Sequence, residues 1–280
     1  MELTQEKVEF FINETKKISE YDFSGYSLKS FTRRLEKILS DNHTDIEELI
    51  KKMDKNRKFL ETVVKEITVN TTEPFRTPSL WKTLIPIIRE KFSKLESINI
   101  WHAGCSTGQE VYSMLMLLYE MGMFHKTKLY GSDLNEDVLE TARSGKYRIH
   151  DFDEYWDNFT QSMSDFPKFN PEEYLDVNKR RGIVKVKSFL VEKPVFVKHN
   201  LIKDGNIFGI KFNMIMCRNV LIYFDHDLQD KVFNFFYENL TEDGILVIGK
   251  HESILSPIQR KFDRVDSIYL VKNEEDNWIF

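Results

Sequence analysis

The stretch INIWHAGCSTGQEVYSM (residues 98–114), followed by LYGSDLNEDVLETARSGKYR (129–148), decides the fold. An apolar strand runs into a loop of small residues with Gly104 and Gly108, a helix follows, and a second strand ends at Asp133. This β-turn-α-β unit is typical of the nucleoside-binding half of a doubly wound sheet, where the acid after the second strand holds ribose hydroxyls. The alternative for Asp133 is that it caps the next helix.

The rest of the chain after residue 80 continues this alternation, which predicts a mostly parallel sheet with helices on both faces. The predicted helices are 81–92, 108–121, 135–144 and 226–239, and the predicted strands are 98–103, 127–132, 212–217, 245–249 and 268–272. Two further β-rich runs, 183–189 and 194–198, interrupt the alternation. We expect them to pair as a small antiparallel insertion at about 176–200.

The first part of the chain has a helical pattern throughout, and we expect an all-helical domain over residues 1–66. Residues 67–80 contain Pro74 and Pro78 among polar residues and are predicted to link it to an α/β domain over 81–280.

One N-terminal helix has an apolar and a basic side. The apolar side is formed by Leu28, Phe31, Leu35, Ile38 and Leu39, and the basic side by Lys29, Arg33, Arg34 and Lys37. The basic side is either the solvated face of a helical bundle or a docking surface for an acidic partner.

The composition excludes several classes of protein. The chain has 280 residues, of which 41% are hydrophobic, and a net charge of −5. This charge argues against general nucleic-acid binding. No apolar run approaches the roughly 18 residues that span a bilayer, and the start lacks the features of a signal peptide. Two distant cysteines outside any CxxC pair argue against a disulfide framework and a metal site, so we expect a cytoplasmic protein without a metal. We also expect it to be a monomer.

The glycine loop narrows the choice of nucleotide. Gln109 follows Gly108 where a phosphate-binding loop requires lysine, and the spacing differs from the dinucleotide pattern G-x-G-x-x-G. Glu110 places a carboxylate at the start of a helix, where the positive end of the helix dipole would otherwise attract an anionic ligand. It either complements the helix dipole or meets the ammonium group of a ligand such as S-adenosylmethionine.

Five segments together resemble the CheR-type methyltransferases, which transfer methyl groups from S-adenosylmethionine to glutamate side chains of bacterial chemoreceptors. The segments are NTTEPFR (70–76), AGCSTGQE (103–110), SDLN with ARSGKY (132–147), Asn200-Leu201 and CRNVLIYFD (217–225). The resemblance covers nearly the whole chain, and CRNVLIYFD is its most specific part. It implies a Rossmann-like S-adenosylmethionine-dependent methyltransferase domain with a β insertion and a helical N-terminal domain.

The resemblance also assigns roles to individual residues. Those expected to bind S-adenosylmethionine, or S-adenosylhomocysteine as the product, are Asn70, Thr72, Arg76, Gly104, Glu110, Asp133, Asn200, Leu201, Asn219 and Val220. Arg76 and Tyr223 are expected to contact the substrate carboxylate as catalytic residues. Judged without the resemblance, Tyr223 is an ordinary core aromatic residue and Asn200 a turn residue.

The implied chemistry needs few catalytic groups. A glutamate side chain, with an ordinary pKa of about 4.3, is already ionised at neutral pH, so no general base is required. Methylated receptor helices carry glutamates, which favours the docking interpretation of Lys29, Arg33, Arg34 and Lys37. The chemoreceptors are then the partners, with neither nucleic-acid binding nor direct membrane insertion.

The chain departs from the family pattern at Pro74, where an aromatic residue is common, and at His251, where serine is typical. Two alternatives to a receptor methyltransferase remain. The chain could methylate another signalling protein, or it could be a non-catalytic nucleoside-binding sensor or scaffold.

Overall fold

The computed structural model describes residues 3–68, 71–149 and 152–272. The chain forms two compact units. The smaller unit comprises residues 1–70 together with 220–232, and the larger unit comprises residues 71–219 and 233–280.

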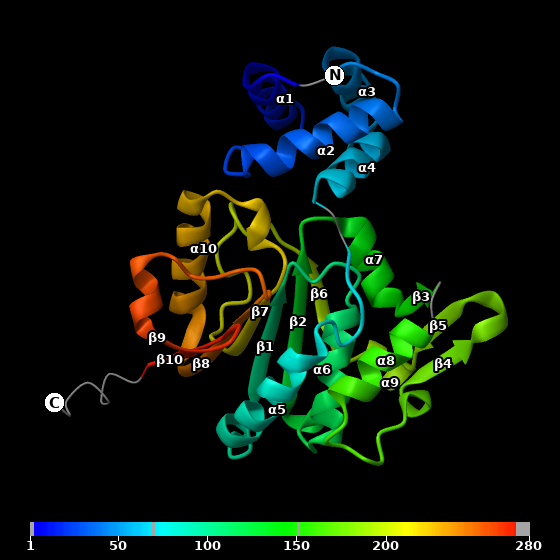
Figure 1. Ribbon diagram of the computed structural model, residues 1–280, viewed down its shortest axis with the longest axis vertical. Helices are drawn as coiled ribbons and strands as arrows, with labels where there is room; N and C mark the ends of the chain where they lie inside the picture. The colour runs from blue at the N-terminus through cyan, green and yellow to red at the C-terminus, as the bar shows by residue number, and fades with distance from the viewer. Residues whose placement is uncertain (1–2, 69–70, 150–151, 273–280) are drawn as a thin grey trace. The chain divides into compact units, whose positions relative to one another are not determined.

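The larger unit is built on a seven-stranded sheet (Figure 1). The strands are β1 (Ile98–Ala103), β2 (Thr127–Asp133), β6 (Val195–Lys198), β7 (Phe212–Cys217), β8 (Leu240–Ile248), β9 (Phe262–Val265) and β10 (Ile268–Val271). Their order is β6-β2-β1-β7-β8-β10-β9, and only the pairings of β10 with β8 and with β9 are antiparallel. Almost all residues of β1 and β7 are buried, as expected for parallel strands covered on both faces.

Helices cover both faces of this sheet, which confirms the predicted doubly wound class. On one face, Ile98 and Ile100 share an apolar cluster with buried side chains of α5 (Pro78–Phe92), α6 (Gln109–Glu120) and α7 (Glu136–Ser144). On the other face, the Trp101 ring contacts Phe235 and Phe236 in the second half of α10 (His226–Asn239).

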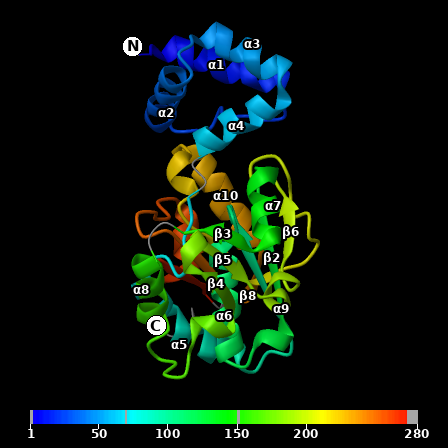
Figure 2. The same cartoon turned by 90° about the vertical axis from the view of Figure 1, so that its right-hand side faces the viewer.

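An antiparallel sheet of three strands is inserted after α7, as Figure 2 shows from the side. It has the order β3-β5-β4, with β3 (Lys146–Arg148), β4 (Leu175–Asn178) and β5 (Ile183–Val186). The helices α8 (Phe152–Ser162) and α9 (Ser188–Val191) and the short helices η2 (Pro171–Glu173) and η3 (Lys179–Arg181) belong to the same region. The remaining short helices are η1 (Phe124–Lys126), η4 (Leu221–Tyr223) and η5 (Pro257–Lys261).

The predicted pairing of 183–189 with 194–198 is wrong. The strand at 195–198, β6, pairs in parallel with β2 and forms an edge of the main sheet. A reason lies at Gly131 in β2, where an added Cβ would lie 2.6 Å from the Phe196 ring. The absence of a side chain at Gly131 lets the β6 aromatic ring pack against β2.

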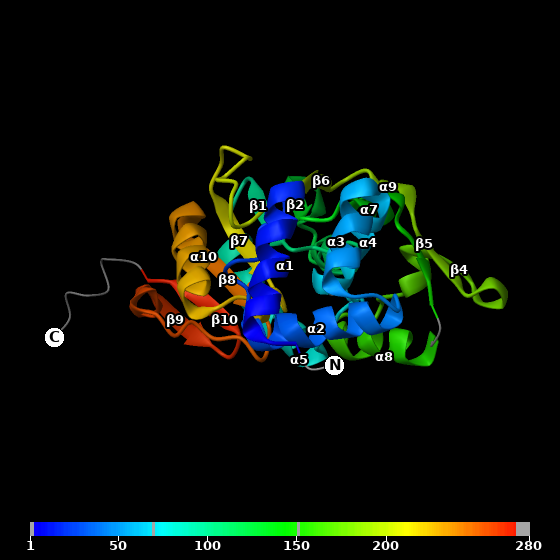
Figure 3. The same ribbon diagram turned by 90° about the horizontal axis from the view of Figure 1, so that it is seen from above.

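The N-terminal part of the smaller unit consists of four packed helices, seen in Figure 3. They are α1 (Gln5–Ile18), α2 (Leu28–Asp41), α3 (Ile46–Lys55) and α4 (Arg57–Thr68). On α2, Phe31, Leu35 and Ile38 are buried as predicted, but Leu28 is 40% exposed. Leu28 is the first residue of α2, so its side chain extends beyond the apolar contact of the bundle.

Residues 220–232 complete the smaller unit. Tyr26 forms an antiparallel bridge with Phe224, the Ser27 backbone N–H donates to the Tyr223 carbonyl at 2.8 Å, and the Asp225 N–H donates to the Gly25 carbonyl at 2.9 Å. The segment before α2 is thereby joined by backbone hydrogen bonds to the end of the CRNVLIYFD motif.

Both cysteines, Cys105 and Cys217, are buried free thiols. Desolvation by burial raises the pKa of each thiol well above its ordinary value. Within the described ranges, the helices lack the length and apolar character that crossing a membrane requires.

Candidate functional site

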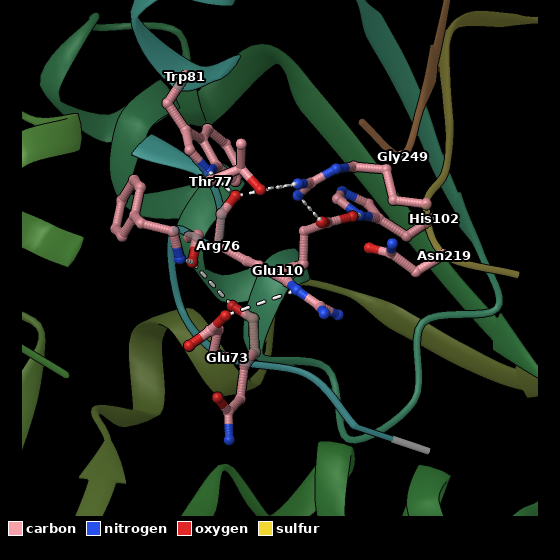
Figure 4. A network of polar contacts seen from close by, with 12 residues as sticks. Glu73, Arg76, Thr77, Trp81, His102, Glu110, Asn219 and Gly249 are labelled. Atoms are coloured by element: carbon pink, nitrogen blue, oxygen red, sulfur yellow. Dashed lines mark hydrogen bonds and ion pairs between the residues drawn. The ribbon is translucent and has the colours of Figure 1, made fainter. Parts of the chain in front are cut away.

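The candidate site lies at the carboxyl ends of the parallel strands in the larger unit. The strand order reverses between β1 and β7, and such a reversal is where doubly wound sheets bind their ligands. Asp133 ends β2 at this edge, and the loops after β1, β7 and β8 supply Gly104, Asn219 and Gly249. Figure 4 shows part of the polar network that they join.

The loop after β1 is closed onto the end of β2. Gly104 has a φ of 74°, and its N–H donates to the Ser132 carbonyl at 2.8 Å. The Ser106 N–H donates to one carboxylate oxygen of Asp133 at 2.8 Å, and the Asn135 N–H donates to the other at 3.1 Å. Asp133 is therefore fixed at the base of the loop.

The alternative interpretation of Asp133 as a helix cap is wrong. Asn135 is the N-cap residue of α7, and its side-chain oxygen accepts from the Asp137 N–H at 2.8 Å. Asp133 is only 8% exposed. Burial raises the pKa of its carboxyl, although the backbone N–H groups of Asn135 and Ser106 oppose this.

Glu110 is already paired within the protein. Its carboxylate accepts from the Arg218 guanidinium, and it lies 3.2 Å from Nδ1 of His102 (Figure 4). Burial by itself would raise the pKa of Glu110, but the Arg218 charge and the contacts with His102 and Arg218 lower it to about 2. Arg218 and His102 therefore compensate the charge of Glu110 within the protein, and contact with a ligand ammonium stays a prediction.

The linker bends sharply around Arg76. Phe75 and Thr77 have φ values of 48° and 64°, a region that L-residues rarely adopt. The Phe75 N–H donates to Ser113 Oγ at 2.9 Å, which attaches the bend to α6. The carbonyl of Arg76 accepts from Trp81 Nε1 at 3.2 Å.

Arg218 holds the same bend from the other side. One of its terminal nitrogens donates to the Arg76 carbonyl at 3.0 Å and to Thr77 Oγ1 at 3.1 Å. In contrast to this fixed backbone, the Arg76 side chain is 37% exposed, and within the described ranges its ion-pair partner is Glu73, at 3.5 Å (Figure 4). The bend therefore presents a guanidinium whose main chain is fixed and whose charge is accessible.

Asn219 occupies a tight turn after β7. Its φ is 59°, and its N–H donates to Glu252 Oε2 at 2.9 Å, which also accepts from the Gly249 N–H at 2.5 Å. A Cβ at Gly249 would lie 2.6 Å from that carboxylate oxygen and 3.0 Å from the Asn219 nitrogens. Glycine at 249 therefore permits the loops after β7 and β8 to meet.

Asn200 begins a turn after β6. Its side-chain oxygen accepts from the N–H groups of Ile202 and Lys203 at 3.0 and 3.2 Å. The preceding His199 N–H donates to the Asp133 carbonyl at 2.9 Å, so Asn200 and the half-buried Leu201 follow directly from the Asp133 edge. The turn interpretation of Asn200 holds, and a role at the adenine edge stays a prediction.

The other predicted residues are distributed as follows. Thr72 is half-buried in the larger unit, and Asn70 lies outside the described residues. Val220 and Tyr223 belong to the smaller unit. Both are half-buried, so the interpretation of Tyr223 as a core residue is wrong.

The predicted docking residues on α2 separate into two kinds. Lys29 and Arg33 are exposed, and within the described ranges neither has an ion-pair partner. Lys37 forms an exposed ion pair with Asp41 at 2.5 Å. The half-buried Arg34 donates to the Ile67 carbonyl and lies over the Tyr223 ring, so it is no freely available cation.

Several buried polar atoms around Asp133 and Glu110 leave hydrogen-bonding capacity unused. Among the described residues, the buried atoms without a partner include Ser106 Oγ and Asn135 Nδ2, whose backbones hold Asp133, and His102 Nε2 and Arg218 Nε, whose side chains hold Glu110. Buried polar atoms are nearly always hydrogen-bonded in native proteins, so orphans around two acids indicate a place for a polar ligand or ordered water.

Sequence reasoning missed several residues of this network, chiefly Arg218, His102 and Glu252. Arg218 lies inside the most specific motif, CRNVLIYFD, from which the resemblance assigned roles to Asn219, Val220 and Tyr223 but not to Arg218. His102 lies in β1, where a histidine within an apolar run could have been noticed. Nothing in the sequence relates Glu252 to Asn219, because the two meet only through the folding of β7 beside β8.

These features define the class of Rossmann-like enzymes that bind a nucleoside cofactor after β1 and β2. The family model described as the CheR methyltransferase, SAM binding domain, matches residues 70–270, and the chain belongs to this family. It is an S-adenosylmethionine-dependent methyltransferase.

Curated relatives agree with this membership. Cher3 of Pseudomonas putida is 32% identical over 241 residues, which cover 84% of each chain. The chemotaxis protein methyltransferase of Borreliella burgdorferi is 32% identical over 224 residues, covering 76% of this chain and 74% of the relative. That of Listeria monocytogenes is 25% identical over 268 residues, covering 94% and 96%.

Proposed function

We propose that the protein methylates glutamate side chains on the cytoplasmic helices of chemoreceptors and forms glutamyl methyl esters. The observation that carries the proposal is the accessible Arg76 guanidinium on a bend that Arg218, Trp81 and Ser113 fix. The relatives named as chemotaxis protein methyltransferases support the same assignment.

Arg76 suits the orientation of a carboxylate. Its present partner, Glu73, is 41% exposed and lies 3.5 Å away, so a substrate carboxylate can replace it at little cost. A guanidinium binds a carboxylate with defined geometry through paired N–H donors. Arg76 thus acts as an orienting clamp, and Tyr223 shares the carboxylate oxygens as a hydrogen-bond donor.

The remaining residues would hold the cofactor. Bound S-adenosylmethionine supplies a methyl group on a cationic sulfur, to which an ionised glutamate is a sufficient nucleophile. Asp133 would accept from the ribose hydroxyls, and Asn200 with the Leu201 backbone would meet the adenine edge. The residues assigned to the methionine end and its surroundings are Asn70, Thr72, Gly104, Glu110, Asn219 and Val220.

Catalysis of the methyl transfer therefore depends mainly on the correct placement of the two reactants. In-line transfer requires the reacting atoms at roughly 3–3.5 Å and exclusion of water from the carboxylate. A strong cationic grip would reduce the nucleophilicity of that carboxylate, so the half-exposed Arg76 suits the task better than a fully buried arginine.

The first prediction concerns Arg76→Ala. We expect methyl transfer to fall on the order of 100-fold, as for other losses of substrate orientation, while the affinity for S-adenosylhomocysteine changes much less. Transfer would be followed with isotope-labelled cofactor and purified receptor cytoplasmic fragments, and affinity by calorimetry. Arg89→Ala, at an exposed position of α5, is the matched control. Equal losses of transfer and affinity would refute the clamp assignment.

The chemical identity of the product tests the proposal directly. Mass spectrometry of the receptor fragment should locate a base-labile methyl ester on specific glutamates. Cofactor binding without transfer to any receptor fragment would instead indicate a different acceptor or a sensor module.

A further inference from the structure

We infer that Arg34 of α2 is a positioning residue for Tyr223, and that it acts through this tyrosine rather than as a docking cation. The inference rests on the proposed role of Tyr223 at the substrate carboxylate. Both residues belong to the smaller unit.

The contact between the two side chains is close. The guanidinium carbon of Arg34 lies 4.0 Å from the centroid of the Tyr223 ring, well within the roughly 6 Å of a cation–π interaction. The same guanidinium donates through one terminal nitrogen to the Ile67 carbonyl in the last turn of α4. The Arg34 guanidinium is therefore held by the α4 backbone and also lies against the face of the Tyr223 ring.

The main chain around Tyr223 is anchored to the same helix. Ser27, the N-cap residue of α2, donates its N–H to the Tyr223 carbonyl at 2.8 Å. The adjacent Phe224 is buried against Tyr26, with ring centroids 5.2 Å apart. Thus the backbone at 223–224 is fixed by residues that precede α2, and the half-buried Tyr223 ring is fixed by Arg34.

The neighbours of Arg34 show that this use of an arginine is specific. Lys29 and Arg33 on the same helix are exposed, whereas Arg34 is half-buried. A docking surface for an acidic helix needs accessible cations, which Lys29 and Arg33 supply. Arg34 instead lies over the Tyr223 ring. We therefore assign Lys29 and Arg33 to partner docking and Arg34 to the positioning of Tyr223.

The chemistry explains why such positioning matters. A half-exposed tyrosine without the contact can rotate about its side-chain bonds, and each alternative rotamer moves the hydroxyl by several ångströms. Since transfer depends on near-attack geometry, loss of orientation lowers kcat more than it changes binding.

The experiment compares adjacent arginines. Arg34→Ala should lower kcat for receptor fragments on the order of tenfold, the range of a cation–π contact, without changing the KM for S-adenosylmethionine. Arg33→Ala removes the same charge one residue away and should raise the KM for the receptor instead. Arg34→Lys, which keeps a cation over the ring, should recover part of kcat, and Arg34→Gln, which keeps a donor for Ile67, should not.

A double-mutant cycle with Tyr223→Phe decides whether Arg34 acts through the tyrosine hydroxyl. If it does, Arg34→Ala has little further effect on kcat in the Tyr223→Phe background. The same fold-loss in both backgrounds, or an Arg34→Ala profile that matches Arg33→Ala, overturns the inference. Melting temperatures of all variants separate loss of positioning from unfolding of the helical bundle.

The cycle also distinguishes failure of the inference from failure of the proposed function. If Tyr223→Phe transfers methyl groups at the wild-type rate, the assigned role of Tyr223 is wrong and the inference fails with it. If Tyr223→Phe is impaired but Arg34→Gln and Arg34→Ala are not, only the inference about Arg34 is overturned.

Discussion

Arg218 is the residue on which most of the candidate site depends. Its side chain is 3% exposed and contacts Glu110, the Arg76 carbonyl and the Thr77 hydroxyl. Removing one partner of a buried pair leaves the other charge uncompensated, which typically costs about 3–5 kcal/mol. A single side chain thus connects the start of α6 to the bend that presents Arg76.

The acid stability of the protein follows from this pair. The pKa of Glu110 falls from 4.5 to about 2 on folding, so its contribution to stability is complete above pH 4.5 and is lost as the pH falls from 4.5 towards 2. We predict that Glu110→Gln is less stable than the wild type by about 3 kcal/mol at pH 7, with the difference shrinking over this window. Urea unfolding at pH 7, 5, 4 and 3 measures it.

Glu136→Gln is the matched control, because Glu136 pairs with Arg143 on the surface, with side chains 45% and 42% exposed. Its unfolding curve should follow the wild type within about 1 kcal/mol at every pH. A constant offset between Glu110→Gln and the wild type from pH 7 to pH 3 would contradict the assignment of the Glu110 shift.

At the scale of elements, the sequence predicted the helices and strands whose bounds follow from the pattern of their own apolar and polar residues. The strands at 98–103 and 212–217 and the helix at 226–239 have the predicted bounds, because short apolar segments mark the two strands and apolar residues at helical spacing mark the helix. A strand was predicted at 194–198 and is found at Val195–Lys198, but the predicted pairing with 183–189 is wrong. The alternation of exposed and buried positions at Val195 and Phe196 indicates which side chains face the core, but it does not identify the neighbouring strand. The close packing of Phe196 on Gly131 is what places this strand beside β2.

The candidate site shows the same difference between residues that a local sequence pattern identifies and contacts that form only on folding. Asp133 and the glycine loop were found because both belong to one recognisable β-turn-α-β pattern, in which each follows a strand. The Glu110–Arg218 pair and the Asn219–Glu252 contact join segments that are 108 and 33 residues apart, and no periodic pattern encodes them.

For α2 we predict that reversal of two charges, Arg33→Glu with Lys37→Glu, slows methylation of intact receptor by about tenfold or more at low salt. Like charges then oppose the acidic receptor helix, and the effect should diminish at higher ionic strength because surface charges are screened. The affinity for S-adenosylhomocysteine should stay as in the wild type. Rates at 50 and 300 mM salt provide the measurement.

The matched control for this prediction is Lys55→Glu with Lys58→Glu, which reverses two exposed charges on α3 and α4. If the control slows receptor methylation as strongly as the α2 variant, net charge rather than the α2 surface governs the rate.

At the scale of the whole molecule, the two units can be observed separately. Of the four tryptophans in the sequence, Trp81, Trp101 and Trp156 lie in the described part of the larger unit, and Trp81 and Trp101 are buried there, while Trp278 lies outside the described residues. Tryptophan fluorescence therefore reports unfolding of the cofactor-binding unit, whereas circular dichroism also includes the helices of the smaller unit.

We predict that S-adenosylhomocysteine at 100 times its Kd stabilises the fluorescence transition by about 2.7 kcal/mol, which raises its Tm by roughly 5–11 °C. Asp133→Ala should abolish this shift. An unchanged shift in Asp133→Ala would remove Asp133 from the cofactor site. Ser79→Ala, at an exposed position of α5, is the control and should retain the full shift.

The two buried thiols have a practical consequence for experiments on the intact molecule. Since Cys105 and Cys217 are sequestered and their pKa values are raised, maleimide reagents should react with neither on the timescale of labelling an exposed cysteine. A cysteine introduced at an exposed position, such as Ser24 or Lys250, would then carry a single dye in the otherwise native sequence. The chain is therefore suited to single-molecule recordings of receptor encounters without prior removal of its own cysteines.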